Sequence, residues 1–290
     1  MPRTSSPLRY PGGKTQLTSF VRNLLITNNI VEGTYIEPFA GGAGVAIQLL
    51  LDGDVNSIVI NDYDKSIYSI WYSILNNTEK FISLIFNTPI TIDEWYKQKA
   101  VYLRNKNRQN SLEGAFATFF LNRTNVSGII SGGPIGGMNQ TGKYKIDCRF
   151  NKVDLIRKIR LIADRRENIT LYRKDALELI DIINENYDTD STLIFFDPPY
   201  YVQGKNLYLS FYSNNSHKKL FEKIGILNDF YWITTYDYAP QISEIYHNAD
   251  QKYEYELSYS VNKKRKAKEF MFASEKIQID SFDKVLLSKI

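Results

Sequence analysis

Short apolar runs alternate with amphipathic segments over both ends of the chain. Mostly apolar runs predict buried strands, and apolar residues at helical spacing predict helices after most of them. The strands are expected at 35–39, 57–62, 169–172, 193–196 and 231–237, and the helices at 17–25, 44–51, 65–75, 176–186, 217–227 and 239–246. This alternation predicts an α/β fold with a mostly parallel sheet. Further strands expected at 253–261 and 270–273 predict a C-terminal antiparallel hairpin.

The alternation fades between residues 76 and 168. Helical periodicity is present around 92–103 and 112–121, and a glycine-dense loop covers 132–142. A basic helix is expected to follow, with Arg157, Lys158, Arg160, Arg165 and Arg166. We therefore expect a mainly helical inserted module at 76–168, which divides the main domain into 1–75 and 169–290. Such a loop with flanking cations suits contacts to base edges and phosphates, although solvated surface is the alternative for any single cation.

The composition narrows the possible chemistry. The chain has 290 residues, of which 43% are hydrophobic, and it contains neither a run long enough to span a bilayer nor an N-terminal leader. We therefore expect a soluble, cytoplasmic protein without a membrane partner. With Cys148 as the single cysteine and His217 and His247 as the two histidines, a Cys/His zinc cluster cannot form, and no metal site is expected. The net charge of +4 is compatible with a nucleic-acid partner or a plain solvated surface.

The strand predicted at 193–196 stops at Asp197-Pro198-Pro199-Tyr200. The prolines prevent the strand from continuing and make a stiff backbone after it. Because ligands bind at the carboxyl ends of strands in an open α/β sheet, Asp197 and Tyr200 are expected where a substrate can reach them. An ordinary turn after a buried strand is the alternative.

Further carboxylate residues are expected at the ends of other strands. Glu37, Asp62 and Asp175 are expected at strand ends like that of Asp197, and a glycine loop at 40–44 follows the first strand. Glycines allow close approach of the backbone to a ligand, and the following helix offers free N–H groups. Asp62 is placed to accept hydrogen bonds from a ribose diol, or it caps the helix that begins near residue 65. The pattern predicts a cofactor pocket beside a reaction site.

Two known motifs of nucleotide-binding sites do not match this chain. The segment Gly13-Lys14-Thr15 lacks the preceding glycine of a P-loop, since Leu8 occupies that position. The loop at 40–44 is not a dinucleotide fingerprint, because Ile47 stands where a small residue is needed.

Four stretches together resemble the DNA adenine N6-methyltransferases of the Dam type. They are 8–14 (Leu-Arg-Tyr-Pro-Gly-Gly-Lys), 37–44 (Glu-Pro-Phe-Ala-Gly-Gly-Ala-Gly), 120–123 (Phe-Leu-Asn-Arg) and 197–200 (Asp-Pro-Pro-Tyr), with a weaker similarity at 268–270. Their order and spacing match the family over nearly the whole chain. The resemblance implies a Rossmann-like methyltransferase domain, with 76–168 as the target-recognition domain for duplex DNA.

The resemblance also implies S-adenosylmethionine as the cofactor and assigns roles to residues. Asp197, Pro198 and Tyr200 are the implied catalytic residues, with Asp197 and the Pro198 carbonyl as acceptors for the adenine amino group and Tyr200 stacked on the base. The implied cofactor pocket comprises Tyr10, Lys14, Glu37, Phe39, Ala40, Gly41, Gly44, Asp62, Asp175 and Asp197. A paired adenine cannot reach such a pocket, so the base is expected to flip out of the duplex.

DNA contacts are expected from the module and from a basic turn. The candidates in the module are Arg123, Asn125, Ser127, Ile129, Ser131, Lys143 and Tyr144, and those in the turn are Lys263, Lys264 and Arg265. The turn is equally well interpreted as a solvated hairpin tip. Where family members that recognise GATC have Tyr-Asn-Gly-Leu-Cys-Arg, this chain has Val126-Ser127-Gly128-Ile129-Ile130-Ser131, so the target sequence is not predicted. Ile129 or Ile130 is an apolar wedge or a buried residue.

The sequence thus predicts a site-specific DNA adenine N6-methyltransferase. A cognate restriction endonuclease is a further candidate partner, and a monomer is expected. The alternatives are a methyltransferase acting on RNA adenine or on N4 of DNA cytosine, and an inactive DNA-binding homologue.

Overall fold

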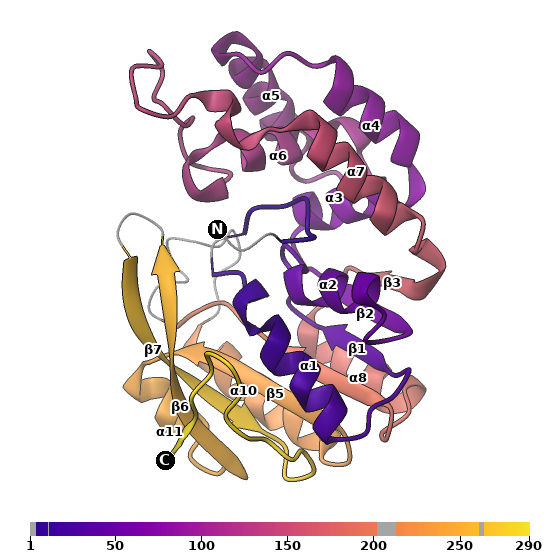
Figure 1. Cartoon of the computed structure of the whole chain (residues 1–290), viewed down its shortest axis with the longest axis vertical. Coiled ribbons are helices and arrows are strands. Elements are labelled where there is room, and N and C mark those ends of the chain that lie inside the picture. The colour runs from indigo at the N-terminus through magenta and orange to yellow at the C-terminus, as the bar shows by residue number, and fades with distance from the viewer. Residues whose placement is uncertain (1–3, 11, 202–212, 261–263) are drawn as a thin grey trace.

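A mostly parallel β-sheet forms the centre of the protein in a computed structural model (Figure 1). The structure describes residues 4–10, 12–201, 213–260 and 264–290, with the backbone alone at 258–260, 264 and 265. The strands are β1 (Thr34–Glu37), β2 (Ser57–Asn61), β3 (Ile169–Tyr172), β4 (Thr192–Phe196), β5 (Tyr231–Asp237), β6 (Gln251–Ser260), β7 (Lys264–Ala273) and β8 (Ser288–Lys289). Their order is β3-β2-β1-β4-β5-β7-β6-β8, parallel from β3 to β5 and antiparallel beyond. The predicted fold class is confirmed.

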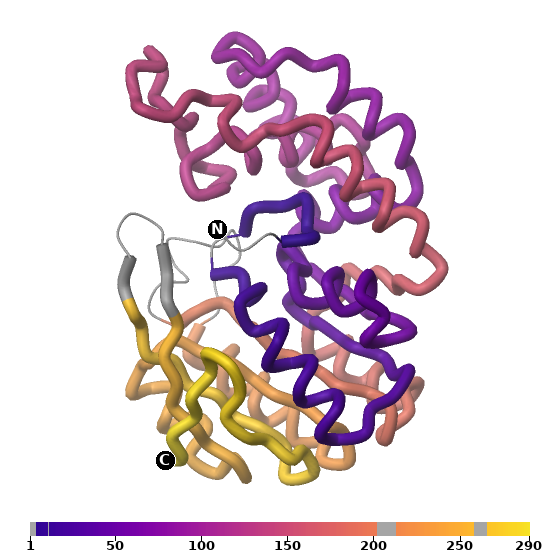
Figure 2. The backbone as a smooth tube through the Cα atoms, viewed as in Figure 1, coloured from indigo at the N-terminus to yellow at the C-terminus, as the bar shows by residue number. Residues whose placement is uncertain are grey.

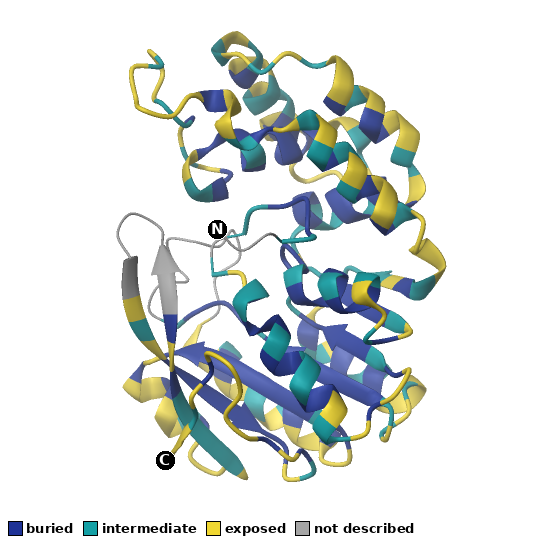
Figure 3. Cartoon of the chain, viewed as in Figure 1, coloured by how far each residue is buried: buried dark blue, intermediate teal, exposed yellow. Residues whose placement is uncertain are grey.

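Helices cover both faces of this sheet. On one face lie α1 (Thr18–Thr27), which follows the 3-10 turn η1 (Thr15–Leu17), α2 (Gly44–Asp52) and α3 (Lys65–Asn76). On the other lie α8 (Ala176–Asn186), α10 (Asn214–Ile224) with the 3-10 turn η5 (Gly225–Leu227), and α11 (Pro240–Ile245). Tyr35 of β1 packs in the first core and Ile36 in the second, and both are fully buried. Burial on both faces explains why the strands are continuous apolar runs, and Figure 3 shows the buried centre.

A helical unit interrupts the α/β order, as the sequence predicts. It contains α4 (Thr78–Asn87), α5 (Ile92–Asn105), α6 (Leu112–Thr124) and α7 (Lys152–Ala163), with 3-10 turns η2 (Val126–Gly128), η3 (Ile146–Arg149) and η4 (Arg166–Asn168). Arg165 and Arg166, predicted to lie on the basic helix, lie beyond its end, because α7 stops at Ala163. The apolar core continues from α2 and α3 into this unit. A division into catalytic and recognition domains stays a prediction.

The N-terminal segment 4–15 connects the helical unit to the sheet. Figure 2 shows this indigo segment between the two. The Asn122 side chain on α6 is 1% exposed and accepts a hydrogen bond from Arg9 N at 2.9 Å. It also donates to Arg9 O at 2.6 Å and to Gly128 O at 3.1 Å. One amide therefore ties the N-terminal segment to both α6 and the turn after it.

Among the described residues, no helix is both long and apolar enough to cross a membrane.

We expect Asn122→Ala to destabilise the protein by about 2 kcal/mol, because it leaves buried backbone groups of Arg9 and Gly128 without their partner. Urea unfolding followed by circular dichroism measures the change. Asn186→Ala is the matched control, since it removes one exposed hydrogen bond to Ile182 O. Equal stability of the two variants would contradict this role for Asn122.

Candidate active site

The candidate site lies where the chain changes direction across the sheet. Strand β1 pairs with β2 on one side and with β4 on the other. The connections after β1 and β4 therefore leave the sheet side by side, which is the place where open α/β sheets bind ligands. The glycine loop follows β1, Asp62 follows β2 and Asp197 follows β4. The predicted gathering of these groups at one sheet edge agrees with this topology.

The glycine loop is held in place from three directions. Gly41 adopts a left-handed conformation with φ of +48°, and a Cβ at this position would lie 2.7 Å from the Tyr10 ring. Gly41 N donates to Asp62 Oδ2 at 3.0 Å, and Trp71 Nε1 donates to Gly41 O at 2.9 Å. Glycine is therefore required here both for the backbone conformation and for the contact with Tyr10. The structure brings Tyr10, Gly41 and Asp62 together.

Asp62 does not cap the following helix. Asp64 is the N-cap residue of α3, where its side chain accepts from Ser66 N and Ile67 N. Asp62 instead accepts from Gly41 N through Oδ2 and from Asp64 N through Oδ1. A carboxylate has about four acceptor positions, so each oxygen keeps room for a further donor such as a hydroxyl. Desolvation raises the pKa of Asp62 to about 7, and the charge of Asp64 adds to this shift.

Glu37 lies beneath the glycine loop. Its carboxylate accepts from Ala46 N in the first turn of α2 at 3.0 Å. Burial raises the pKa of Glu37 to about 8, against the effect of this hydrogen bond. Gly44 begins α2 against the Thr15 side chain, where a Cβ would collide with Thr15 Oγ1. Ala40 is buried and Phe39 is partly exposed.

The buried Asn61 joins the ends of three strands. Asn61 Nδ2 donates to Pro38 O at 2.8 Å and to Lys174 O at 3.1 Å, and Oδ1 accepts from Lys174 N at 2.8 Å. The adjacent Asp175 is exposed and caps α8 by accepting from Leu177 N. The structure thus gives Asp175 a capping contact, and its contact with a cofactor stays a prediction.

The residues after β4 meet the N-terminal segment in a polar cluster. Lys14 Nζ lies 2.6 Å from Tyr200 Oη, 2.9 Å from Glu269 Oε2 and 3.3 Å from Asp197 Oδ1. Tyr200 Oη donates to Glu269 Oε1 at 2.7 Å, and Tyr255 Oη donates to Glu269 Oε2 at 2.6 Å. The Lys14 side chain is only 3% exposed. Lys14, assigned from the resemblance to the cofactor, thus contacts both Asp197 and Tyr200.

One oxygen of Asp197 is held and the other is open. Thr235 Oγ1 on β5 donates to Asp197 Oδ1 at 2.9 Å, the same oxygen that faces Lys14. Asp197 Oδ2 has no hydrogen-bond partner in the part of the chain that the structure describes. Desolvation raises the pKa of Asp197 to about 6, although the Lys14 ammonium lowers it. The carboxylate is fixed in orientation and still able to accept a hydrogen bond.

The backbone after Asp197 is also fixed. Pro198 and Pro199 are buried, and Tyr201 N donates to Asp237 Oδ1 of β5 at 2.8 Å. The stiff platform expected from the two prolines is therefore anchored on the neighbouring strand.

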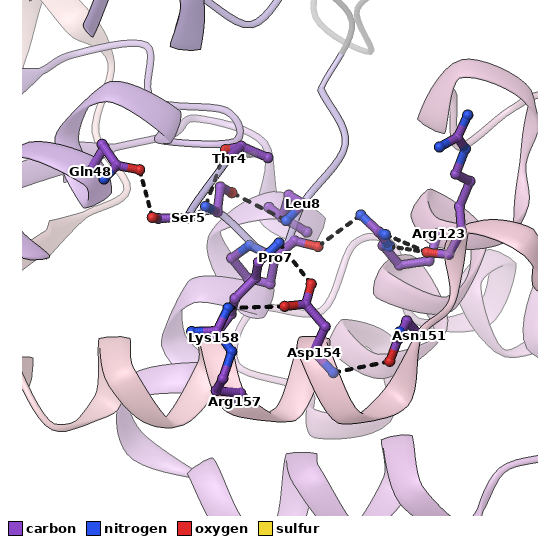
Figure 4. Close-up of polar contacts among 12 residues, drawn as sticks. Thr4, Ser5, Pro7, Leu8, Gln48, Arg123, Asn151, Asp154, Arg157 and Lys158 are labelled. Atoms are coloured by element: carbon purple, nitrogen blue, oxygen red, sulfur yellow. Dashed lines mark hydrogen bonds and ion pairs between the residues drawn. The ribbon is translucent and has the colours of Figure 1, made fainter. Parts of the chain in front are cut away.

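Two of the residues predicted to contact DNA have structural partners. Asn125 is fully buried, where Oδ1 accepts from Trp95 Nε1 and Nδ2 donates to carbonyls of the following turn. Arg123 is partly buried and donates to Arg149 O and Pro7 O (Figure 4). Burial, with the charges of Arg9 and Arg149, lowers the pKa of Arg123 to about 10. Asn125 thus has no surface to offer a base, since each of its polar atoms is engaged inside the protein.

The other candidates in the module differ in exposure. Ser131, Lys143 and Tyr144 are exposed, with Lys143 Nζ 5.8 Å from the centre of the Tyr144 ring. Ser127 and Ile129 are partly exposed, whereas Ile130 is buried. Lys263 lies outside the described residues, and Lys264 and Arg265 are placed in β7 by their backbone alone.

Sequence reasoning missed Thr235, Glu269 and Asn61 as site residues. Glu269 is 1% exposed, and it directly precedes a run of buried residues that begins at Phe270. A carboxylate that borders such a run is the signal that could have identified it, since buried charges need partners. Thr235 and Asn61 lie in ordinary strand sequences and give no such signal.

Comparison with known proteins agrees with this geometry. A family model described as D12 class N6 adenine-specific DNA methyltransferase matches residues 10–230. The Type II methyltransferase M.MjaIII of Methanocaldococcus jannaschii is 27% identical over 206 residues, which cover 67% of this chain and 68% of that protein. The Type II methyltransferase M.CviBI of Paramecium bursaria Chlorella virus NC1A is 24% identical over 197 residues, with coverages of 67% and 68%.

Among solved structures, the rRNA methyltransferase aviRa of Streptomyces viridochromogenes aligns with a TM-score of 0.40 and 10% identity, over 92% of this chain and 88% of that chain. The family match extends over most of this chain and includes the glycine loop, the Asn122-Arg123 pair and the Asp197–Tyr200 motif. The chain therefore belongs to the D12 class N6 adenine-specific DNA methyltransferases.

Proposed function

We propose that this protein transfers the methyl group of S-adenosylmethionine to N6 of an adenine flipped out of duplex DNA at a specific sequence. The observation that carries the proposal is the state of Asp197. One carboxylate oxygen is held by Thr235 and Lys14, and the other is open beside the strand that leads into the glycine loop. This arrangement suits a hydrogen-bond acceptor for an amine that gains positive charge.

The glycine loop and its neighbours fit the proposed cofactor. Asp62 retains acceptor capacity for ribose hydroxyls, and the left-handed Gly41 lets the backbone approach a ligand closely. The Tyr10 ring closes over the loop from the N-terminal segment. Bound S-adenosylmethionine would supply an electrophilic methyl group on a sulfonium. Phe39, Ala40 and Gly44 would complete the pocket around the loop, with Glu37 beneath it and Asp175 at its rim.

Asp197 and Pro198 would activate the adenine amino group by accepting its two hydrogens. The amino nitrogen is a weak nucleophile because its lone pair is delocalised into the ring, and two acceptors favour the pyramidal form. No base is needed before attack, since the nitrogen would become positive only as its bond to the methyl carbon forms and the methyl–sulfur bond breaks, with the electron pair going to the sulfur of the leaving thioether. The Asp197 carboxylate would stabilise that charge. The nitrogen would then lose one proton, which the Asp197 carboxylate can accept.

Tyr200 would hold the flipped base by stacking. Its hydroxyl is bonded to Glu269 and Lys14, so the ring presented to the base is fixed. Flipping costs a few kcal/mol, which stacking and the hydrogen bonds to Asp197 and Pro198 offset.

The helical unit would bind the duplex next to this pocket. Ser131, Lys143 and Tyr144 are exposed on its loops, with Ser127 and Ile129 partly exposed on the turn after α6. Arg123 would act through the turn η3, where it donates to Arg149 O. Lys263, Lys264 and Arg265 would add phosphate contacts. The two Type II relatives support site-specific methylation. We further propose a cognate restriction endonuclease as a functional partner and action as a monomer.

The direct test is incubation with labelled S-adenosylmethionine and mixed-sequence duplex DNA, followed by digestion to nucleosides. We expect the label on N6-methyldeoxyadenosine. Label on cytosine alone, on RNA alone in a parallel reaction, or on neither would overturn the proposal in favour of the corresponding alternative.

We expect Asp197→Ala to lower the single-turnover rate of methylation by roughly 1,000-fold, because the charge that stabilises the reacting nitrogen is lost. Isothermal titration should show cofactor affinity within a few fold of wild type. Asp250→Ala, at an exposed position, is the matched control. A near-normal rate in Asp197→Ala would refute the role assigned to this carboxylate.

The single-turnover rate is expected to fall as the pH decreases through about 6, the pKa of Asp197. The sign follows because protonation removes the negative charge, so the ionised and active form prevails above the pKa. A series of single-turnover rates over pH at constant ionic strength measures this acidic limb of the pH–rate profile. Asp197→Asn should lose it, and an identical limb in that variant would assign the titration to another group.

Asp62→Ala should weaken S-adenosylmethionine binding by roughly 10- to 100-fold, since hydrogen bonds to a carboxylate contribute about 1.5–3 kcal/mol. Its neighbour provides the control: Asp64→Ala should destabilise the fold by about 1 kcal/mol through loss of a helix cap, with cofactor affinity unchanged. Equal cofactor affinities in the two variants would place the ribose elsewhere.

A further inference from the structure

Glu269 occupies a buried position at the centre of the polar cluster. It lies on β7, where it pairs in register with Asp237 of β5 and with Tyr255 of β6. Its carboxylate receives hydrogen bonds from Tyr200 Oη at 2.7 Å, Tyr255 Oη at 2.6 Å and Lys14 Nζ at 2.9 Å. Both carboxylate oxygens are therefore committed inside the protein, unlike those of Asp197. Because Glu269 is only 1% exposed, we expect it to act on the site through these partners and not by direct contact with the substrate.

The charges of the cluster depend on Glu269. Lys14 Nζ is 2.9 Å from Glu269 Oε2 and 3.3 Å from Asp197 Oδ1, so one ammonium faces two carboxylates. Without Glu269, the positive charge of Lys14 and the negative charge of Asp197 would cancel next to the reacting nitrogen. With Glu269 present, the cluster of these three side chains carries one net negative charge. Such a charge favours a nitrogen that becomes positive, and it acts strongly where water is excluded.

The geometry of Tyr200 depends on the same carboxylate. The phenolic hydroxyl donates to Glu269 Oε1 and accepts from Lys14 Nζ, and Lys14 Nζ lies 4.7 Å from the centre of the Tyr200 ring. The hydroxyl lies on the axis about which the ring rotates, so these hydrogen bonds fix the position of the far end of the ring and the direction of its long axis. The ring follows Asp197 and Pro198 directly, so its position helps to set where a stacked base meets both acceptors.

We propose that Glu269 is a positioning residue for methyl transfer: it fixes the Tyr200 ring through the phenolic hydroxyl and balances the charge of Lys14, which leaves the charge of Asp197 available to the reacting nitrogen. This inference rests on the proposed function. A purely structural alternative exists, in which Glu269 serves only to join β7, β6 and the N-terminal segment.

The pH dependence separates these two roles. The groups that face Asp197 are Lys14 from the N-terminal segment, Glu269 from β7, Glu37 and Tyr35 from β1, and the Tyr200 hydroxyl. The charge of Glu269 raises the pKa of Asp197, and that of Lys14 lowers it. Removal of either charge should therefore move the acidic limb of the rate, and the two removals should move it in opposite directions.

The test compares Glu269→Gln, which keeps the size of the side chain and removes its charge, with wild type in single-turnover methylation of duplex DNA. We expect a loss of roughly 100-fold in rate, the scale of a misplaced reacting group. S-adenosylmethionine affinity should stay within about twofold, because the Glu269 carboxylate is hydrogen-bonded to Lys14, Tyr200 and Tyr255, which lie outside the glycine loop. The acidic limb should move to lower pH in Glu269→Gln and to higher pH in Lys14→Gln.

Glu254→Gln is the matched control. It breaks an ion pair with Lys268 on the same hairpin, with a separation of 3.1 Å, and should keep the wild-type rate. If Glu269→Gln keeps the wild-type rate and the wild-type acidic limb of the pH–rate profile, the inference is wrong. A slower rate with an unmoved acidic limb would also overturn it, because that result indicates a structural role alone. If Glu269→Gln fails to fold, Tyr200→Phe tests the same contact: we expect roughly tenfold slower transfer, and an unchanged rate would contradict the inference.

The outcome of the wild-type reaction keeps the two proposals apart. If wild type and Glu254→Gln methylate adenine and Glu269→Gln does so equally well, only the inference about Glu269 fails. If wild-type protein transfers no methyl group to adenine, the proposed function itself fails.

Discussion

The buried ammonium of Lys14 is the constraint on which the candidate site depends. A charge removed from water costs several kcal/mol unless it is paired and hydrogen-bonded. Lys14 meets this need with Asp197, Tyr200 and Glu269, which come from the segment after β4 and from β7. These segments are far apart in the sequence, so the cluster forms only when the sheet is complete. Among the described residues, the same contacts leave Asp197 Oδ2 without a hydrogen-bond partner, so the arrangement that stabilises Lys14 is also the one that our proposal needs for catalysis.

A second set of contacts joins the helical unit to the cofactor loop. Asn122 on α6 bonds to Gly128 of the following turn and to the backbone of Arg9, whose neighbour Tyr10 packs on Gly41. The turn that follows α6 is therefore connected to the glycine loop through Asn122, Arg9 and Tyr10. By our proposal, this connection fixes the distance between the helical unit, which would hold DNA, and the glycine loop, which would hold the methyl donor. Rigid placement of this kind is a large part of catalysis by orientation.

The regular elements were predictable because burial leaves a pattern in the sequence. Strand β5 at 231–237 and helix α8 at 176–186 have their predicted bounds, because turn residues border each of them. Strand β5 packs between the two apolar cores, and α8 packs against one of them. Polar roles were harder, because they depend on partners remote in sequence. Asn125 was predicted to contact DNA and is buried against Trp95. Glu269 entered the sequence analysis only through the weaker similarity at 268–270, yet it lies at the centre of the polar cluster. The motif at 197–200 was recognisable because the residues proposed to act together are adjacent in the sequence.

By our proposal, the Asp197 carboxylate at the end of β4 directs methylation of adenine at specific DNA sites. Sequencing of genomic DNA for modified bases, after expression in a host without DNA methylation, tests it most directly. We predict N6-methyladenine at nearly every copy of one short sequence, and none after expression of Asp197→Ala. Unmodified adenine in cells that contain the folded wild-type protein, or the same modification with Asp197→Ala, would contradict the account.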